Sequence, residues 1–128
     1  MMLEWDQDEL WEAARNNDPG SIGAFWDALR QFCPKPGNDR KKVVIMQVKT
    51  GRQIRPHTHP EWTLLYYLEP ANTPIIINDK PYIPKSGELI VLEPDVLHSV
   101  AKNESDKKRI SFAMLVEKDE QGKLVSEG

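Results

Sequence analysis

Residues 51–69 have the sequence GRQIRPHTHPEWTLLYYLE, in which a histidine-rich turn leads into a strongly apolar segment. Two of the chain's three histidines, His57 and His59, lie at its centre, and Glu61 follows two residues later. In an extended chain alternate side chains point to the same face, so these three groups are expected on one side of a strand. The stretch therefore predicts a strand with one polar face that is able to bind a metal ion.

The chain around this stretch is predicted to consist of short strands from Lys42 onward. The β-branched and aromatic runs are KVVIMQVK (42–49), WTLLYYLE (62–69), PIIIND (74–79), ELIVLE (88–93) and KRISFAMLVE (108–117). Turn-forming residues separate these runs, and no helical pattern interrupts them. This spacing is typical of an all-β sandwich or barrel.

Two short helices are expected before the strands. Asp6, with Glu9 three residues later, resembles a capping box and predicts a helix that runs to about Asn16. Ser21 is expected to cap a second helix, which the prolines at 34 and 36 would end. Apolar residues recur at helical spacing in this second helix, so its apolar face is expected to pack on the main body or on a second subunit: Ile22, Phe25, Trp26, Leu29 and Phe32.

The length and composition bound the class of protein. The 128 residues fit one domain, which we divide into a helical segment packed on the barrel (1–36), a β-barrel (37–117) and a polar tail (118–128). The net charge of -3 comes from mixed acidic and basic residues, which favours neither nucleic acid nor an anionic membrane as partner. The single cysteine, Cys33, excludes an internal disulfide, and no apolar run is long enough to span a bilayer. A soluble, cytoplasmic protein is expected.

The third histidine, His98, ends another strand-and-turn unit, LIVLEPDVLH. All three histidines thus lie at strand ends within the β region. Two histidines at alternate positions and a third from a neighbouring strand can bind one metal ion from one side, which leaves positions open for water, oxygen or substrate. A structural zinc site would more often use several cysteines.

These residues fall in a wider pattern that resembles the cupin superfamily. The first motif of that family is a glycine, five residues and His-x-His, and here Gly51 is followed by RQIRP and then by His57 and His59. The second motif is matched by Gly87-Glu88, LIVL, Glu93-Pro94-Asp95 and His98, with Asn103 near the family's downstream asparagine. The resemblance covers roughly residues 43–116. It implies a double-stranded β-helix, or jelly-roll barrel, with the two short helices in front of it.

The resemblance also implies a metal site on His57, His59 and His98. The glutamate of the first motif, four residues after its second histidine, is replaced here by Thr63. Either Glu61 takes its place as a fourth ligand, or the site uses three histidines only. Iron(II) is the expected metal, with manganese, nickel and zinc as alternatives. Cupins often pair through their barrel edges, so a homodimer is also expected.

The first functional hypothesis is a mononuclear iron(II) dioxygenase that acts on a small molecule. Three neutral imidazoles leave more positive charge on the metal than a set with a carboxylate, which favours an anionic or chelating substrate. Three-histidine cupins that cleave thiols or diketones with oxygen are the family precedent. Trp62, Tyr66 and Met114 are candidate pocket residues, although core packing is the simpler role for each.

Two other hypotheses remain open. His59, Glu61 and His98 match the His-x-acid…His triad of 2-oxoglutarate-dependent iron oxygenases, and Arg109-Ile110-Ser111 resembles the Arg-x-Ser that binds 2-oxoglutarate. The simpler role for Arg109 is a solvated charge at the start of a strand. The third hypothesis is a cupin that binds a small ligand without catalysis, because a fold alone does not determine function.

Overall fold

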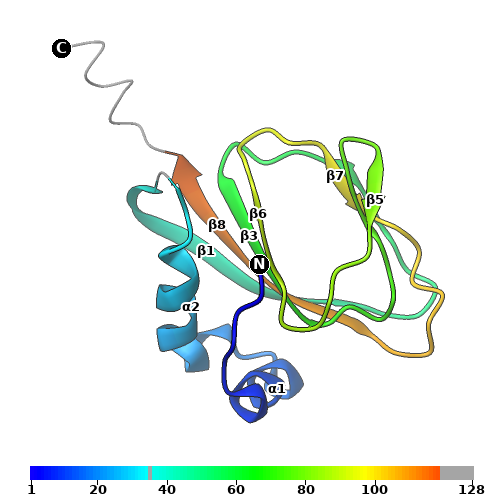
Figure 1. Cartoon of the computed structure of the whole chain (residues 1–128). Helices are drawn as coiled ribbons and strands as arrows, with labels where there is room; N and C mark the ends of the chain where they lie inside the picture. Colours follow the sequence, from blue (N-terminus) through cyan, green and yellow to red (C-terminus); the bar gives the residue numbers. More distant parts are fainter. Residues whose placement is uncertain (35, 119–128) are drawn as a thin grey trace.

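The computed structural model describes residues 1–34 and 36–118. Within this part the chain forms two α-helices, one turn of 3-10 helix and eight strands (Figure 1). The helical elements are α1 (Gln7–Asn16), η1 (Pro19–Ile22) and α2 (Gly23–Arg30). The strands are β1 (Pro36–Val48), β2 (Ile54–His57), β3 (Trp62–Glu69), β4 (Ile75–Ile77), β5 (Lys80–Tyr82), β6 (Leu89–Leu92), β7 (His98–Val100) and β8 (Arg109–Lys118).

The strands form two four-stranded antiparallel sheets that face each other (Figure 1). The first sheet has the order β1-β8-β3-β6 and the second has the order β2-β7-β4-β5. Except for the hairpin of β4 and β5, neighbours within a sheet are not consecutive in sequence, as in β1 with β8 and β2 with β7, so the chain crosses repeatedly between the sheets. The predicted all-β architecture with two short N-terminal helices is confirmed.

The first sheet is buried on both of its faces. Along β3, Leu64, Tyr66 and Leu68 pack on the side of the helices, whereas Leu65 and Tyr67 point toward the second sheet. All five are at most 6% exposed. A strand buried on both faces has no polar alternation, which explains the continuous apolar run WTLLYYLE. Alternation along the strand still decides which side chains reach the space between the sheets.

Helix α1 begins where the sequence predicted. The Asp6 carboxylate accepts hydrogen bonds from the backbone N–H groups of Asp8 and Glu9, at 3.0 and 3.4 Å, and so caps the helix. Asn17 ends it in the left-handed conformation, with φ of 47°. The buried face of α1 consists of Leu10, Ala13 and Ala14.

Helix α2 begins differently from the prediction. Ser21 does not cap it, because residues 19–22 form the 3-10 turn η1 and the Ser21 hydroxyl donates back to the Asp18 carbonyl at 2.8 Å. Pro19 favours this tight turn since its fixed φ suits the first helical position. The helix ends at Arg30, and β1 already begins at Pro36, so that proline opens a strand.

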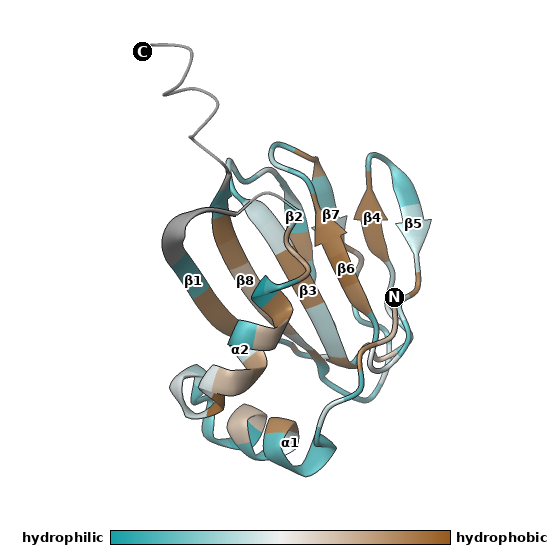
Figure 2. Ribbon diagram, turned by 60° about the vertical axis from the view of Figure 1, so that its left-hand side comes forward, coloured by the Kyte–Doolittle hydropathy of each residue, from teal (hydrophilic) through white to brown (hydrophobic). Residues whose placement is uncertain are grey.

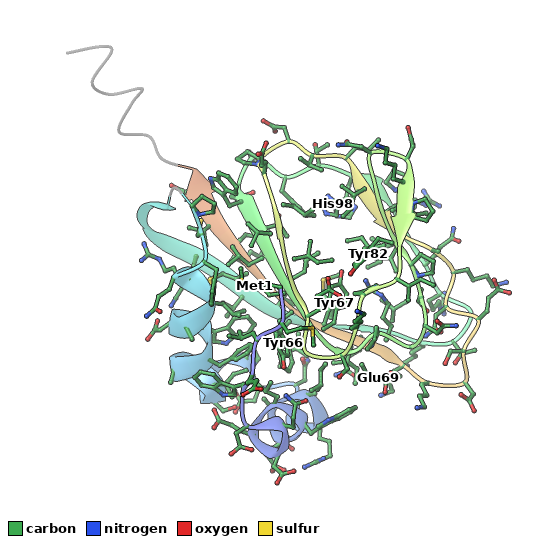
Figure 3. All side chains as sticks on the ribbon, in the orientation of Figure 1. Met1, Tyr66, Tyr67, Glu69, Tyr82 and His98 are labelled. Carbon is green, nitrogen blue, oxygen red and sulfur yellow. The ribbon has the colours of Figure 1, made fainter. Side chains whose placement is uncertain are left out.

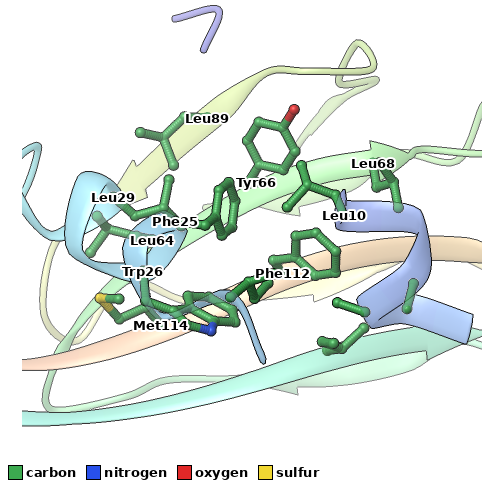
Figure 4. Packing of buried hydrophobic residues seen from close by; sticks show 14 of the residues in the cluster. Leu10, Phe25, Trp26, Leu29, Leu64, Tyr66, Leu68, Leu89, Phe112 and Met114 are labelled. Carbon is green, nitrogen blue, oxygen red and sulfur yellow. The ribbon is translucent and has the colours of Figure 1, made fainter. Parts of the chain in front are cut away.

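Phe25 is the centre of the packing between the helices and the first sheet (Figure 4). Its fully buried ring meets four other rings edge to face at centroid distances of 5.1 to 5.5 Å, those of Trp5, Trp26, Tyr66 and Phe112. Edge-to-face contacts add to the stabilisation that burial provides. Figure 2 shows the resulting polarity, with apolar strands behind helices whose outward sides are more polar. The expected packing of the aromatic helix face on the main body is confirmed.

The turns of the two histidine motifs adopt left-handed backbone conformations. Gly51 and Gly87 have φ of 85° and 86°, a region that glycine enters without steric cost. Asp95 also lies there, with φ of 65°, and aspartate is one of the few other residues that tolerate it. Asn103 is fully buried, and its side-chain amide donates to the carbonyls of Val48 and Lys107 at 2.9 and 2.7 Å. These residues fix the loops at the ends of the strands.

The five predicted strands correspond to β1, β3, β4, β6 and β8, whereas β2, β5 and β7 are additional strands of three or four residues. The polar tail predicted for residues 118–128 lies outside the described residues from position 119 onward. Neither α-helix in the described part has the length and apolar character needed to cross a membrane.

We expect Phe25→Ala to lower the free energy of unfolding by about 3–5 kcal/mol, because it empties a fully buried site among four rings. Ile83→Ala is the control, since Ile83 is 48% exposed and its truncation should change stability by less than about 0.5 kcal/mol. Urea unfolding at equilibrium measures both. A loss below about 1 kcal/mol in Phe25→Ala would show that the helices are not part of the cooperatively folded unit.

Candidate metal centre and cavity

His57, His59 and His98 come together between the two sheets, as predicted (Figure 3 labels His98). His57 is the last residue of β2 and His98 the first of β7, and the two are directly paired across these antiparallel strands. His59 lies in the loop before β3, where its carbonyl accepts a hydrogen bond from the Asp95 N–H at 2.7 Å. The turn of the second motif therefore holds the loop of the first.

The three imidazoles offer one nitrogen each within 4.8 Å of the others. The ring centroids are 4.3 Å apart for His57 and His98, 4.8 Å for His57 and His59, and 5.1 Å for His59 and His98. This spacing lets a single ion bind all three rings after small rotations, since metal–nitrogen bonds are about 2.0–2.1 Å long. His98 is buried, and the other two rings are partly exposed, so the cluster lies at the open side of the site.

Backbone carbonyls orient two of the three rings. Nδ1 of His57 lies 2.7 Å from the Arg55 carbonyl oxygen, and Nδ1 of His98 lies 2.9 Å from that of Val96. A carbonyl only accepts hydrogen bonds, so in each ring Nδ1 carries the proton and donates it. The Nε2 lone pair is then free to bind a metal, and this arrangement is the usual support for a histidine ligand.

The surroundings of the cluster favour neutral imidazoles. Burial lowers the pKa of His98, and the neighbouring histidines add to this effect against the opposing hydrogen bond to Val96. Burial also lowers the pKa of His59, assisted by His57 and opposed by Glu61. Because a metal binds only the neutral ring, these shifts keep His59 and His98 able to bind an ion at lower pH than free histidine would be.

The structure does not bring Glu61 into this cluster. The strand β2 ends at His57, and the bend at residues 60–61 interrupts the alternation that would have placed Glu61 beside the histidines. Pro60 contributes to this break, since proline removes a backbone donor. Glu61 acts on His59 only electrostatically. Thr63, which stands at the position of the family's glutamate, is 3% exposed and lines the cavity beside the histidines.

A cavity of about 160 Å³ extends from the histidines between the sheets. Its wall is mainly apolar, with residues from β1, β2, β3, β4, β7 and β8. The lining side chains besides the histidines are Val44, Met46, Ile54, Thr63, Leu65, Tyr67, Ile75, Val100, Arg109, Ser111, Ala113 and Leu115. Trp62, Tyr66 and Met114, the candidate pocket residues, instead pack on the side of the helices. The reason is strand parity: even-numbered residues of β3 and β8 face the helices, and odd-numbered residues face the cavity.

Arg109 lies inside the molecule, so its simpler interpretation as a solvated charge is wrong. It is 1% exposed and lines the same cavity as the three histidines. One terminal nitrogen donates to the Tyr67 hydroxyl at 3.2 Å, and Cζ lies 4.8 Å from the centre of the Tyr67 ring. Burial lowers the pKa of Arg109, and Tyr67 partly offsets this effect.

Tyr67 is a cavity residue that was not identified from the sequence, whereas Ser111 was identified there only as part of the Arg-x-Ser pattern. Ser111 is 1% exposed and is paired with Tyr67 across β3 and β8, so both point into the same space. Tyr67 alternates with Thr63 along β3, and Ser111 alternates with Arg109 along β8, so the sequence already showed that each pair points to one face of its strand. This pattern could be used only once the face of β3 that meets the helices was known.

Comparison with solved structures shows that the chain has the fold of cupin proteins. A cupin family protein with a double-stranded β-helix fold from Methanocaldococcus jannaschii matches at 14% identity and a TM-score of 0.55, over 66% of this chain and 78% of its own. A protein from Photorhabdus luminescens matches at 21% identity and a TM-score of 0.55, over 75% and 79%. A predicted oxalate decarboxylase from Thermotoga maritima matches at 20% identity and a TM-score of 0.52, over 58% and 64%.

No family model matches the sequence, and no curated protein matches it either. At identities of 14–21% the solved structures establish the fold and not the reaction. The expected resemblance to cupins is confirmed at the level of the fold.

Metal-free protein should lose stability as the pH falls from about 6.5 to 5. The unfolded chain takes up protons at histidine near pH 6.5, whereas the lowered pKa values of His59 and His98 keep the folded state from doing so. The unfolded state thus binds more protons in this window, and the free energy of unfolding decreases toward acid. Thermal unfolding of chelator-treated protein between pH 8 and 5 measures the effect.

His98→Gln is the matched variant for this measurement, because it removes the more deeply buried of the two titrating rings. Its unfolding temperature should fall less steeply over the same range of pH. Equal slopes in the two proteins would mean that other groups cause the acid sensitivity.

Proposed function

We propose that this chain, which has the cupin fold, is a mononuclear metal-dependent dioxygenase that acts on a small molecule through His57, His59 and His98. The observation that carries the proposal is the convergence of three imidazoles on one side of a small, mainly apolar cavity. Two of the rings are already held in the tautomer that binds a metal. Three histidine ligands with open positions characterise catalytic rather than structural sites.

The composition of the cavity wall favours chemistry that depends on the metal. Among the described lining residues there is no aspartate, glutamate, cysteine or lysine that would act as a general base or nucleophile. When bound, a redox-active ion such as iron(II) supplies Lewis acidity and electron transfer to oxygen. The protein's own residues bind the ion, position the substrate and exclude water.

Iron(II) is the proposed native metal, and manganese, nickel and zinc are alternatives. Three imidazoles suit all four ions, so the donor set alone does not select among them. Within the described part of the chain no carboxylate belongs to the cluster, so the site would keep the full charge of the ion. This favours a substrate that binds as an anion or chelates the metal.

A 2-oxoglutarate-dependent oxygenase is the second candidate, and one observation favours it. Arg109 and Ser111 line the same cavity as the histidines, as the Arg-x-Ser pattern of that class requires. Two observations weigh against it: Glu61 is outside the cluster, and about 160 Å³ is a small volume for both 2-oxoglutarate and a second substrate. We therefore rank this function below the three-histidine dioxygenase.

The metal site is tested by the metal content of protein that is purified without a histidine tag. We expect about one transition-metal ion per chain and its loss in the His57→Ala/His59→Ala double variant, since one imidazole cannot hold the ion. Glu61→Gln is the matched control and should retain the metal, because Glu61 lies outside the cluster. Loss of metal in Glu61→Gln would instead make Glu61 a ligand.

The reaction class is tested by oxygen consumption after anaerobic loading with iron(II). We expect uptake with a small thiol or diketone acid that does not depend on added 2-oxoglutarate. Uptake that requires 2-oxoglutarate would identify the second candidate. Absence of uptake under both conditions, in protein that retains its metal, would leave a cupin that binds ligands without oxidising them.

A further inference from the structure

Arg109 is a buried cation for which the described residues provide no anionic partner. Its side chain is among the largest fully buried ones, at 1% exposure. Its identified partner is the neutral Tyr67, through the hydroxyl and the ring. Glu88, whose charge acts on Tyr67, is already engaged, since its two carboxylate oxygens accept hydrogen bonds from the Tyr82 hydroxyl and the Lys85 N–H.

Polar atoms next to the cavity are also left without a hydrogen bond. Nε of Arg109 and Oγ of Ser111 are both buried and have no partner within the described structure. Both residues line the cavity that contains the three histidines. A buried charge without a counter-ion and a buried donor without an acceptor each cost free energy, so proteins seldom retain them without a reason.

A purely structural role for Arg109 explains less of this arrangement. The contact with Tyr67 satisfies one of the five N–H donors of the guanidinium and supplies no negative charge. The two residues before Arg109, Lys107 and Lys108, are exposed. A cation in this segment can therefore lie at the surface, and the chain does not need to bury Arg109 for structural reasons. A carboxylate, in contrast, matches both the charge and the fork geometry of an arginine and also accepts from a serine hydroxyl.

We propose that the cavity binds a small carboxylic acid whose carboxylate pairs with Arg109 and Ser111 while its other end faces the histidine cluster. The position of the carboxylate follows from the buried polar groups alone. The placement of the reacting end rests on the proposed function, because it requires a metal on the histidines. The substrate of the dioxygenase is then a short organic acid that is held by its anionic end.

The cavity sets the size of this acid and the nature of its middle part. A dry cavity of about 150 Å³ binds benzene, so about 160 Å³ admits roughly six non-hydrogen atoms. The wall between the polar ends is hydrocarbon, with Leu65, Ile75 and Val100. A short aliphatic chain fits this wall, whereas a sugar or a nucleotide would leave its hydroxyl groups unpaired.

Propionate is the probe for the carboxylate, and neutral propionamide of the same shape is its control. In metal-free protein at low ionic strength, calorimetric titration should detect propionate and not propionamide. Arg109→Met should weaken propionate binding by at least about ten-fold, because it removes a charge-assisted pair from a buried site. Ser111→Ala should weaken it less. Lys108→Met, which removes an exposed cation from the neighbouring residue, should leave the affinity unchanged.

Thermal unfolding without ligand separates binding from a structural role. Arg109→Met should unfold at the same temperature as the unchanged protein or at a higher one, since an unpaired buried charge is lost. A lower unfolding temperature together with equal, weak responses to propionate and propionamide in the unchanged protein would overturn the proposal. If Arg109→Met does not fold, two other results test the carboxylate site: the difference in affinity between propionate and propionamide, and the loss of propionate affinity in Ser111→Ala.

The His57→Ala/His59→Ala variant distinguishes this inference from the proposed function. Propionate binding that persists in the variant supports the carboxylate site whether or not the protein holds a metal. If the protein binds metal on its histidines but binds propionate no more tightly than propionamide, the carboxylate site is contradicted. The proposed function is then unaffected.

Discussion

The burial of both faces of the first sheet is the constraint on which the rest of the structure depends. Phe25 and its aromatic neighbours cover one face of β3 and β8, so every second side chain of these strands packs against the helices. The remaining side chains must face the second sheet. The cavity, with Tyr67, Arg109 and Ser111 in its wall, is therefore a consequence of how the helices pack.

The histidine cluster depends on a second constraint, which is the pairing of short strands in the other sheet. The register of β2 against β7 sets His57 opposite His98, and a backbone hydrogen bond from Asp95 to His59 holds the third ring nearby. Backbone carbonyls then fix the proton on Nδ1 of two rings. The donor geometry is thus built by main-chain interactions, which do not depend on a bound ion for their formation.

The two ends of the cavity differ in chemistry. The histidine cluster is partly open to solvent, whereas Arg109 is a cation that is closed to solvent. The wall of the cavity is mainly apolar, so little water screens the charge of the guanidinium. Unsatisfied polar groups of this kind reduce stability, and sites that recognise ligands are where folded proteins usually carry them.

Much of the fold could be predicted from local patterns. The alternation of strand and turn residues identified five strands, the Asp6 cap located α1, and the two glycine-histidine motifs indicated the cupin fold and the three histidines that cluster. The short strands β2, β5 and β7 were not predicted as separate strands, because three or four residues show too little periodicity to be recognised. Ser21 was misassigned because a serine before an apolar run also fits the 3-10 turn that forms instead.

The sequence by itself determined which residues alternate along each strand, but not which of the two sets faces the cavity. In a strand with apolar residues on both sides the pattern is symmetrical, so Tyr66 and Tyr67 are equivalent until the helices cover one face. The end of β2 at His57, which separates Glu61 from the histidines, is likewise decided by pairing with β7. Only the tertiary structure therefore placed Arg109 inside, since the burial of a charge is set by distant segments that its own neighbours in sequence do not reveal.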